Sequence, residues 1–299
     1  MLRTAGLLAV VALATPTLAQ VPPQPAPTEL ETVVVDGRRL ADVVEQFVDD
    51  IVAPPVGRGP SRWDRKVCVG VANVRAGAAQ VIIDQVSRIA LEVGLEPAEP
   101  GCSPNILVIG TNDGEAMARG LIGAKRRAFL PFYSGGSRSA LALERFQASD
   151  AAVRWWHVGV PVNRYTGEIA VRLPGREAPF VRQDGSRLTT QIQNNLLRAF
   201  IIVDLAQMEG INFHQLGDYV GMVAMAQIDP AAATGAYDTV LNLFSGAGTV
   251  QGLTAWDRAY LNALYSSELN QRAPSHQGGE IAGEMLRGVR TGERASRTD

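Results

Sequence analysis

The chain has few of the residues that build metal sites. Its only histidines are His157, His214 and His276, and no two of them are spaced to hold one ion from a single element. A zinc hydrolase needs about three protein ligands and an open position for water. The sequence therefore predicts no metal ion and no cofactor.

Long apolar runs are also scarce. The run from Ala5 to Leu13 is shorter than the roughly 20 residues that cross a bilayer, and no later segment is long and charge-free enough. The run follows Met1-Leu2-Arg3 and precedes small residues around Ala19, which is the pattern of a secretory signal peptide over residues 1–19. We expect a soluble exported protein without a membrane span.

Lysine occurs only at Lys66 and Lys125, so nearly all the positive charge is arginine. Together with abundant alanine, this suggests a GC-rich bacterial genome, for which export means a periplasmic or extracellular location. The formal net charge is −2, and the basic patch around Arg126 and Arg127 is short. A charge balance of this kind gives no indication of nucleic acid as a partner.

Cysteine occurs only at Cys68 and Cys102. Their spacing fits no zinc knuckle, in which paired ligands stand about two to five residues apart. An even cysteine count in an exported protein favours a disulfide. We expect a Cys68–Cys102 bridge, and the alternative is two buried thiols that never meet.

The composition divides the chain into four parts. Residues 20–29 are rich in proline and predict an extended linker after the signal peptide. Residues 30–268 predict a single α+β domain, in which helices flank a mixed β-sheet. Residues 269–299 are polar and rich in glycine, without a clear apolar face, and predict a flexible tail.

Hydrophobic periodicity predicts the elements of the domain. After a short β-type run at 31–39, the predicted helices cover 40–52, 76–93, 113–130, 137–149 and 254–267. The predicted strands cover 65–74, 105–111, 152–162 and 197–205. We expect 152–162 to form a hairpin with 168–173 through a turn at 163–167.

The stretch "GINFHQLGDYVGMVAMAQIDP" (210–230) predicts a further helix with an unusual face. His214 and Asp218 are four residues apart and share that face with Gly217 and Gly221. Each glycine inside a helix costs about 1 kcal/mol relative to alanine. The glycines therefore indicate either close packing against another backbone or a cleft that admits a ligand. His214 and Asp218 are the candidate catalytic pair, and a solvated ion pair is the alternative.

The stretch "RWWHV" places Trp155 and His157 on one face of a strand and Trp156 on the other. At least one tryptophan should be in the core, while the face that carries Trp155 and His157 is a candidate for lining a cleft together with Gly217 and Gly221. Ser137 lies at a predicted helix start, but the G-x-S-x-G motif of serine hydrolases is absent. A helix cap explains this serine, and weak anion binding is the alternative.

Several of these segments occur together in one family. "RKVCVGVANV", "NILVIGTND", "AVRWWHVGV", "AFIIVD" and "HQLGDYVGMVAMAQIDP", within roughly 60–267, resemble an uncharacterised family of exported Gram-negative bacterial proteins. That family itself resembles zincin-like metallopeptidases. The resemblance implies a sheet, then the helix that carries H-E-x-x-H in zincins, then a closing helix. The two motif histidines fall on Gly217 and Gly221 and the glutamate on Asp218, so the zinc motif is missing.

The leading interpretation is an exported soluble protein without catalytic activity that binds a peptide, a protein or a cell-envelope component. One alternative is a hydrolase of unknown substrate that uses His214 and Asp218. Another is a structural component of an envelope assembly.

Overall fold

A computed structural model describes residues 39–131, 138–172, 177, 186–245 and 250–295. The predicted signal peptide, the proline-rich linker, the β-type run at 31–38 and Ser137 lie outside the described residues. None of the described helices combines the length and the apolar character needed to cross a membrane.

A mixed four-stranded sheet is the centre of the fold. Its strands are β1 (Val69–Ala72), β2 (Ile106–Thr111), β3 (Val153–Asn163) and β4 (Ile192–Asp204). They lie in the order β1-β2-β4-β3, in which β1, β2 and β4 are parallel and β3 is antiparallel to β4. β3 therefore forms one edge of the sheet.

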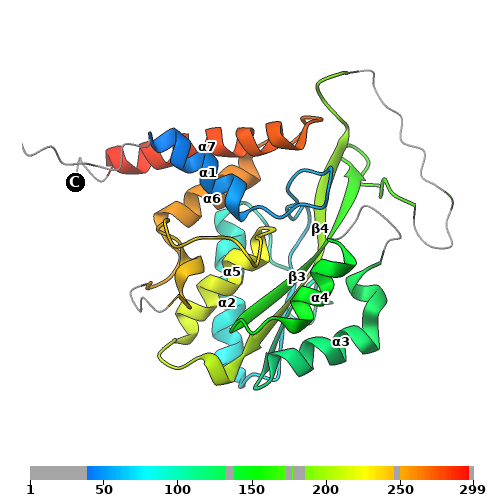
Figure 1. Ribbon diagram of the computed structural model, residues 1–299, viewed down its shortest axis with the longest axis vertical. Coiled ribbons are helices and arrows are strands. Elements are labelled where there is room, and N and C mark those ends of the chain that lie inside the picture. The colour runs from blue at the N-terminus through cyan, green and yellow to red at the C-terminus, as the bar shows by residue number, and fades with distance from the viewer. Residues whose placement is uncertain (1–38, 132–137, 173–176, 178–185, 246–249, 296–299) are drawn as a thin grey trace, which may run out of the picture. The chain divides into compact units, whose positions relative to one another are not determined.

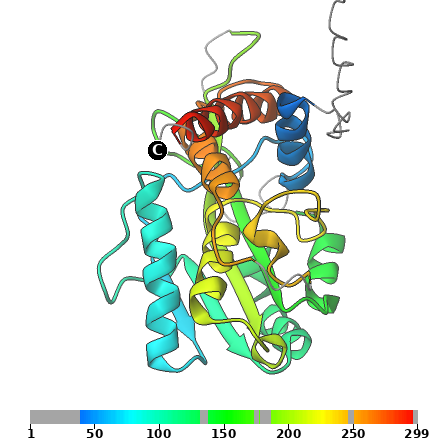
Figure 2. The ribbon, with the colours of Figure 1, turned by 90° about the vertical axis from the view of Figure 1, so that its left-hand side faces the viewer.

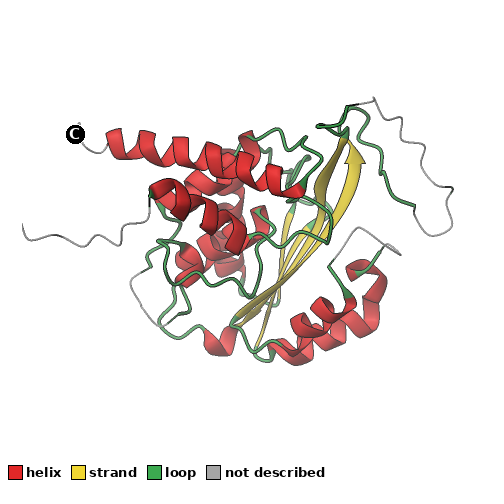
Figure 3. Ribbon diagram, turned by 45° about the horizontal axis from the view of Figure 1, so that its top comes forward, coloured by secondary structure: helices red, strands yellow, loops and turns green. Residues whose placement is uncertain are grey.

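Helices cover both faces of the sheet, as predicted for an α+β fold (Figures 1 and 3). The helices are α1 (Leu40–Ile51), α2 (Ala76–Glu92), α3 (Gly114–Phe129), α4 (Ala140–Ala148), α5 (Phe213–Met225), α6 (Ala255–Ser266) and α7 (Pro274–Ala295). Figure 1 shows α3 and α4 on one side of β3 and α5 on the other. α2 packs on α5, while α7 packs on α1 and α6.

The two covered faces give the sheet two separate hydrophobic cores. Ile201 and Val203 of β4 point into the larger core, together with Trp155 of β3. Ile202 and Trp156 point into a smaller core beneath α3 and α4. Alternate residues of both strands are thus buried on opposite faces, which explains why these strands read as continuous apolar runs.

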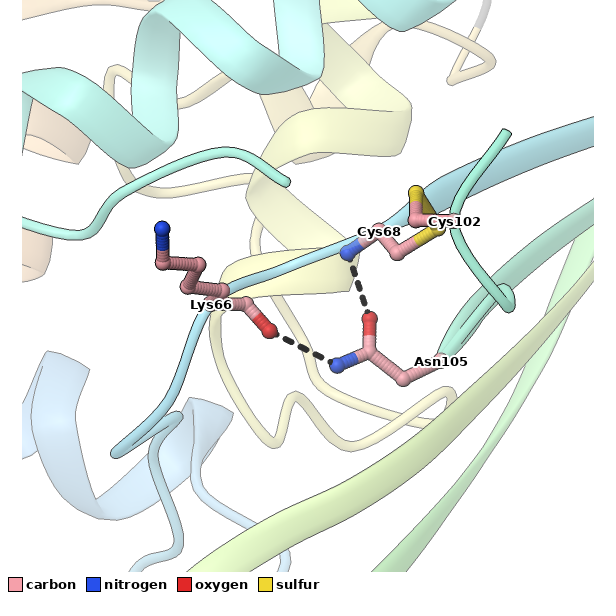
Figure 4. The surroundings of a disulfide bond; sticks show 4 residues. All are labelled: Lys66, Cys68, Cys102 and Asn105. Atoms are coloured by element: carbon pink, nitrogen blue, oxygen red, sulfur yellow. Dashed lines mark hydrogen bonds between the residues drawn. A yellow bond between two sulfur atoms is a disulfide. The ribbon is translucent and has the colours of Figure 1, made fainter. Parts of the chain in front are cut away.

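The predicted bridge between Cys68 and Cys102 is present. Cys68 directly precedes β1, and Cys102 lies in the connection before β2 (Figure 4). Asn105 fastens the same region, since its side chain accepts a hydrogen bond from the Cys68 amide (2.7 Å) and donates one to the Lys66 carbonyl (3.0 Å). The bridge therefore joins the ends of two paired parallel strands.

The hairpin prediction is right at the turn and wrong about the partner strand. The Asn163 amide donates to the Glu168 carbonyl (2.8 Å), and Val162 forms a single bridge with Ile169. The whole of β3, Val162 and Asn163 included, pairs with β4, which begins only at Ile192. A turn signal reports the local reversal of the chain but not how far the pairing continues.

The structure corrects the prediction of a flexible tail over 269–299. Residues Pro274–Ala295 form α7, in which Ile281 and Met285 are fully buried. These two residues lie one turn apart and face α1 and α6. The apolar face that they form is narrow, and the glycines and arginines around it obscure the helical period in the sequence. Packing against α1 and α6 overrides the low helix propensity of the segment.

We predict that removing the disulfide lowers the free energy of unfolding, because the unfolded chain regains conformational entropy. The bridge spans a sequence separation of 34 residues. In the chain-entropy model, a loop of this size contributes about 4 kcal/mol. The double variant Cys68→Ala/Cys102→Ala should therefore lose a few kcal/mol of unfolding free energy in urea melts, and non-reducing mass spectrometry should find the linked peptides. Two alkylatable thiols in the purified, unreduced protein would contradict the prediction.

Candidate functional site

Helix α5 contains the residues that the sequence singled out, and it follows β4 in the chain. A capping box starts it: the Asn212 side chain accepts from the Gln215 amide, and the Gln215 side chain accepts from the Asn212 amide. From Gln215 to Met225 every residue of α5 is buried. The helix is therefore surrounded by other elements along most of its length.

Burial of the C-terminal end of α5 requires partners for its last carbonyls, because a helix leaves about four of them without internal donors. Four donors from outside the helix supply these bonds. His157 Nε2 lies 2.7 Å from Val223 O, Trp63 Nε1 donates to Ala224 O (2.8 Å), Tyr265 Oη donates to Met225 O (2.8 Å), and the Ile228 amide donates to Ala226 O (2.9 Å).

His157 is thus a core residue of β3 that caps α5. The ring is 4% exposed, and a carbonyl acceptor requires Nε2 to carry a proton. Burial lowers the pKa of His157 to about 4; the bond to Val223 opposes this effect, and the nearby Arg138 charge adds to it. His157 is neutral at physiological pH and lies inside the fold rather than beside an open cleft.

Gly217 and Gly221 are the contact between α5 and α2, which lie side by side in Figure 2. A Cβ atom at Gly217 would lie 2.8 Å from Gln85 Cγ, and one at Gly221 would collide with Ile89 Cδ1. The glycines therefore permit close helix packing, one of the two readings that the sequence allowed. The contact with α2 occupies this face, so the alternative of a ligand-admitting cleft beside Gly217 and Gly221 is wrong.

Asp218 connects α5 to its neighbours. Its Oδ1 accepts from Arg88 (2.7 Å) and Gln85 (3.1 Å) of α2, and its Oδ2 accepts from the Leu253 amide (2.9 Å). His214 is exposed at the start of the helix, and no hydrogen bond or ion pair joins it to Asp218. The predicted catalytic pair is not assembled by this geometry.

Within the described part of the chain, no three His, Cys, Asp or Glu side chains gather closely enough to hold a metal ion. The carboxylate that falls on the glutamate of the zincin motif is instead held by α2 and by the segment before α6.

A cavity of about 310 Å³ lies at the beginning of β3, between α4 and the segment after α5. We call it the β3 cavity. Its lining consists of Arg138, Ala142, Arg145, Phe146, Ser149, Ala151, Val153, Arg154, Trp155, Trp156, Tyr219, Asp229, Pro230 and Ala231. Both tryptophans from "RWWHV" contribute, because the cavity reaches around the edge of the sheet. Trp155 lines this cavity, which lies at a different place from the glycine face and does not include His157.

Hydrogen bonds on either side of the β3 cavity hold its walls. Trp155 Nε1 donates to Ile228 O (2.9 Å), and Trp156 Nε1 donates to Phe129 O (2.9 Å). An ion pair between Arg138, just before α4, and Asp229, after α5, links the two walls (3.2 Å). The cavity therefore lies between elements that are fixed relative to β3.

The main chain of β3 has an unpaired edge at this cavity. The Asp204 amide donates to Ala152 O (2.8 Å), which sets the alternation of the antiparallel ladder. By this alternation the main-chain groups of Val153 and Trp155 point away from β4. Outside the sheet, neither residue makes a main-chain hydrogen bond to the backbone of another described residue. Both line the β3 cavity.

No family model, curated protein or solved structure matches this chain. The resemblance to a zincin-like exported family therefore stays a prediction from the sequence. The three arginines of the β3 cavity were missed by the sequence reasoning. The seven-residue spacing of Arg138 and Arg145, which would place them on one side of the helix predicted over 137–149, was the available signal.

We predict opposite effects for alanine at packed and at exposed helix glycines. Gly217→Ala and Gly221→Ala should be neutral or cost up to about 3 kcal/mol, because the added methyl group overpacks the contact with α2. Gly120→Ala in α3 is the matched control: it is exposed with no atom within 4 Å of the new methyl, so it should gain up to about 1 kcal/mol. Thermal and urea melts measure both. A clear gain at Gly217 and Gly221 would show that this face is open.

We predict that His157 makes stability depend on pH. Its folded pKa of about 4 lies below the ordinary value of 6.5, so its contribution is complete above pH 6.5 and is lost as the pH falls toward 4. Between pH 7.5 and 5, the free energy of unfolding should fall by about 2 kcal/mol through this residue. His157→Gln retains an amide donor and should lack this component. A His157 ring that titrates near pH 6.5 by NMR would exclude the assignment.

Proposed function

We propose that this protein is an exported binding protein without catalytic activity, which holds an extended peptide segment in the β3 cavity. The observation that carries the proposal is the unpaired edge of β3 at Val153 and Trp155. A peptide placed there would add a strand to the sheet. Main-chain hydrogen bonds would then provide affinity, and the surrounding side chains would provide selectivity.

The size and walls of the β3 cavity support a peptide ligand. Its volume of about 310 Å³ is at the lower end for ligand pockets, which suits one or two side chains. Trp155 and Tyr219 form an edge-to-face pair with ring centres 6.1 Å apart on one side of β3. Phe146 and Trp156 lie against each other on the other side, also at 6.1 Å. Rigid aromatic walls bind side chains at a low entropic cost.

Export is supported by the N-terminal sequence and by the disulfide, since such bonds persist in oxidising compartments. The resemblance to peptidases also favours a peptide as ligand. The hydrolase alternative has no comparable support, because His214 and Asp218 do not meet. Stoichiometric zinc that is lost in His214→Ala would favour that alternative.

A cavity-filling variant tests the proposal. Peptides would be selected on the purified protein from a randomised phage-displayed library, and their fluorescein-labelled forms measured by anisotropy. Ala142→Phe fills the β3 cavity from α4 and should weaken binding at least tenfold. Ala148→Phe on the same helix is the control, because Ala148 is exposed and does not line the cavity. It should change affinity less than twofold.

Two results would refute the proposal. The first is that no peptide is enriched over the bare support. The second is that enriched peptides bind Ala142→Phe as tightly as the unchanged protein. Circular dichroism would establish that both phenylalanine variants are folded.

A further inference from the structure

The β3 cavity is basic although the protein as a whole is acidic. The chain has a formal net charge of −2, yet three arginines line the cavity against a single acid, Asp229. Tyr219 adds no negative charge, because burial raises the pKa of its phenol. The positive potential is therefore a local property of the cavity rather than of the surface in general.

Arg145 and Arg138 are the accessible cations. Arg145 is exposed on α4 and makes no hydrogen bond or ion pair with the described part of the chain. Arg138 pairs with Asp229, but the two side chains are 26% and 31% exposed. This partly buried contact uses only the Nη2 atom of Arg138. A guanidinium carries five N–H donors, so Arg138 can keep Asp229 and also bind a second carboxylate.

Arg154 supplies charge from the interior. It is 3% exposed, its Nε has no hydrogen-bond partner among the described residues, and its terminal nitrogens only reach carbonyls at 3.5 Å. Burial lowers its pKa, and the carboxylates of Asp204, Glu115, Asp113 and Asp150 oppose this effect from beyond ion-pair distance. An arginine stays protonated in a protein. Arg154 thus adds positive potential behind the cavity.

The aromatic walls strengthen this potential. Phe146, Trp155 and Trp156 keep water from part of the cavity, and the effective dielectric constant falls where water is excluded. A carboxylate that enters between them gains more from the arginines than it would at an open surface.

From this arrangement we infer that the peptide of the proposed function is acidic, and that Arg145 and Arg138 bind one of its carboxylates. The inference rests on the proposed function. An Asp or Glu side chain next to apolar residues matches the cavity, because the extended peptide pairs with β3 while the carboxylate reaches Arg145 of α4 and Arg138 just before that helix. The guanidinium fork fits a carboxylate with two parallel hydrogen bonds.

Two defined peptides test the inference on the full chain. The probes are fluorescein-labelled, C-terminally amidated Val-Glu-Val-Glu-Val and its neutral analogue Val-Gln-Val-Gln-Val, measured by anisotropy at about 50 mM and 500 mM salt. The acidic peptide should bind at least tenfold more tightly at low salt, and the difference should shrink at high salt. Arg145→Gln should weaken the acidic peptide about fivefold and leave the neutral one unchanged.

Arg127→Gln is the matched control, since Arg127 is an exposed arginine on α3 outside the cavity lining. It should leave both affinities unchanged. Equal binding of the two probes would overturn the acidic assignment while peptide binding stands. Failure of these probes and of the whole displayed library would overturn the proposed function itself. Complete displacement of the acidic peptide by about 1 mM inorganic phosphate would show a simple anion site and also overturn the inference.

Discussion

The fold depends on satisfying the buried carbonyl end of α5. A buried carbonyl without a donor costs about 1 to 3 kcal/mol, and four of them end together in the core. The donors come from β3, from α6 and from the segment before β1, so this requirement fixes His157, Tyr265 and Trp63 relative to α5. The chain after α5 is held as well, because the Asp229 amide donates to Ile51 O (2.7 Å). These contacts fix the position of the segment after α5, which forms one wall of the β3 cavity.

Burial of α5 from Gln215 to Met225 leaves the polar and small residues of this stretch with structural roles. Gly217 and Gly221 let α2 approach, and Asp218 binds Arg88 across that contact. A helix used in this way presents no open face on which a substrate could meet His214 and Asp218. The edge of β3 differs, since its main-chain groups at Val153 and Trp155 have no described partner and border a cavity. The proposed peptide binding therefore fits the sheet edge better than the helix.

The sequence predicted the elements whose signal is local. The helices predicted over 76–93 and 254–267 are present as α2 and α6, and the predicted cysteine bridge is present as well. The long pairing of β3 with β4 and the packing of α7 were missed, because both depend on partners distant in the chain. The same holds for the site: "RWWHV" revealed the tryptophans, but only the fold brings Arg138 and Asp229 together across the strand.

The position of the β3 cavity limits what it can hold. An open sheet edge invites unwanted pairing, and proteins protect such edges with proline, charge or covering segments. Pro161 has no amide hydrogen, its carbonyl accepts from the Ala170 amide (2.8 Å), and the turn after Asn163 closes the far end of β3. The unpaired stretch is therefore short and lies between two walls joined by the Arg138–Asp229 pair. A long neutral strand gains few hydrogen bonds there, whereas a short segment with a carboxylate also gains the arginines. The edge protection of the fold and the charge of the cavity thus favour the same small class of ligand.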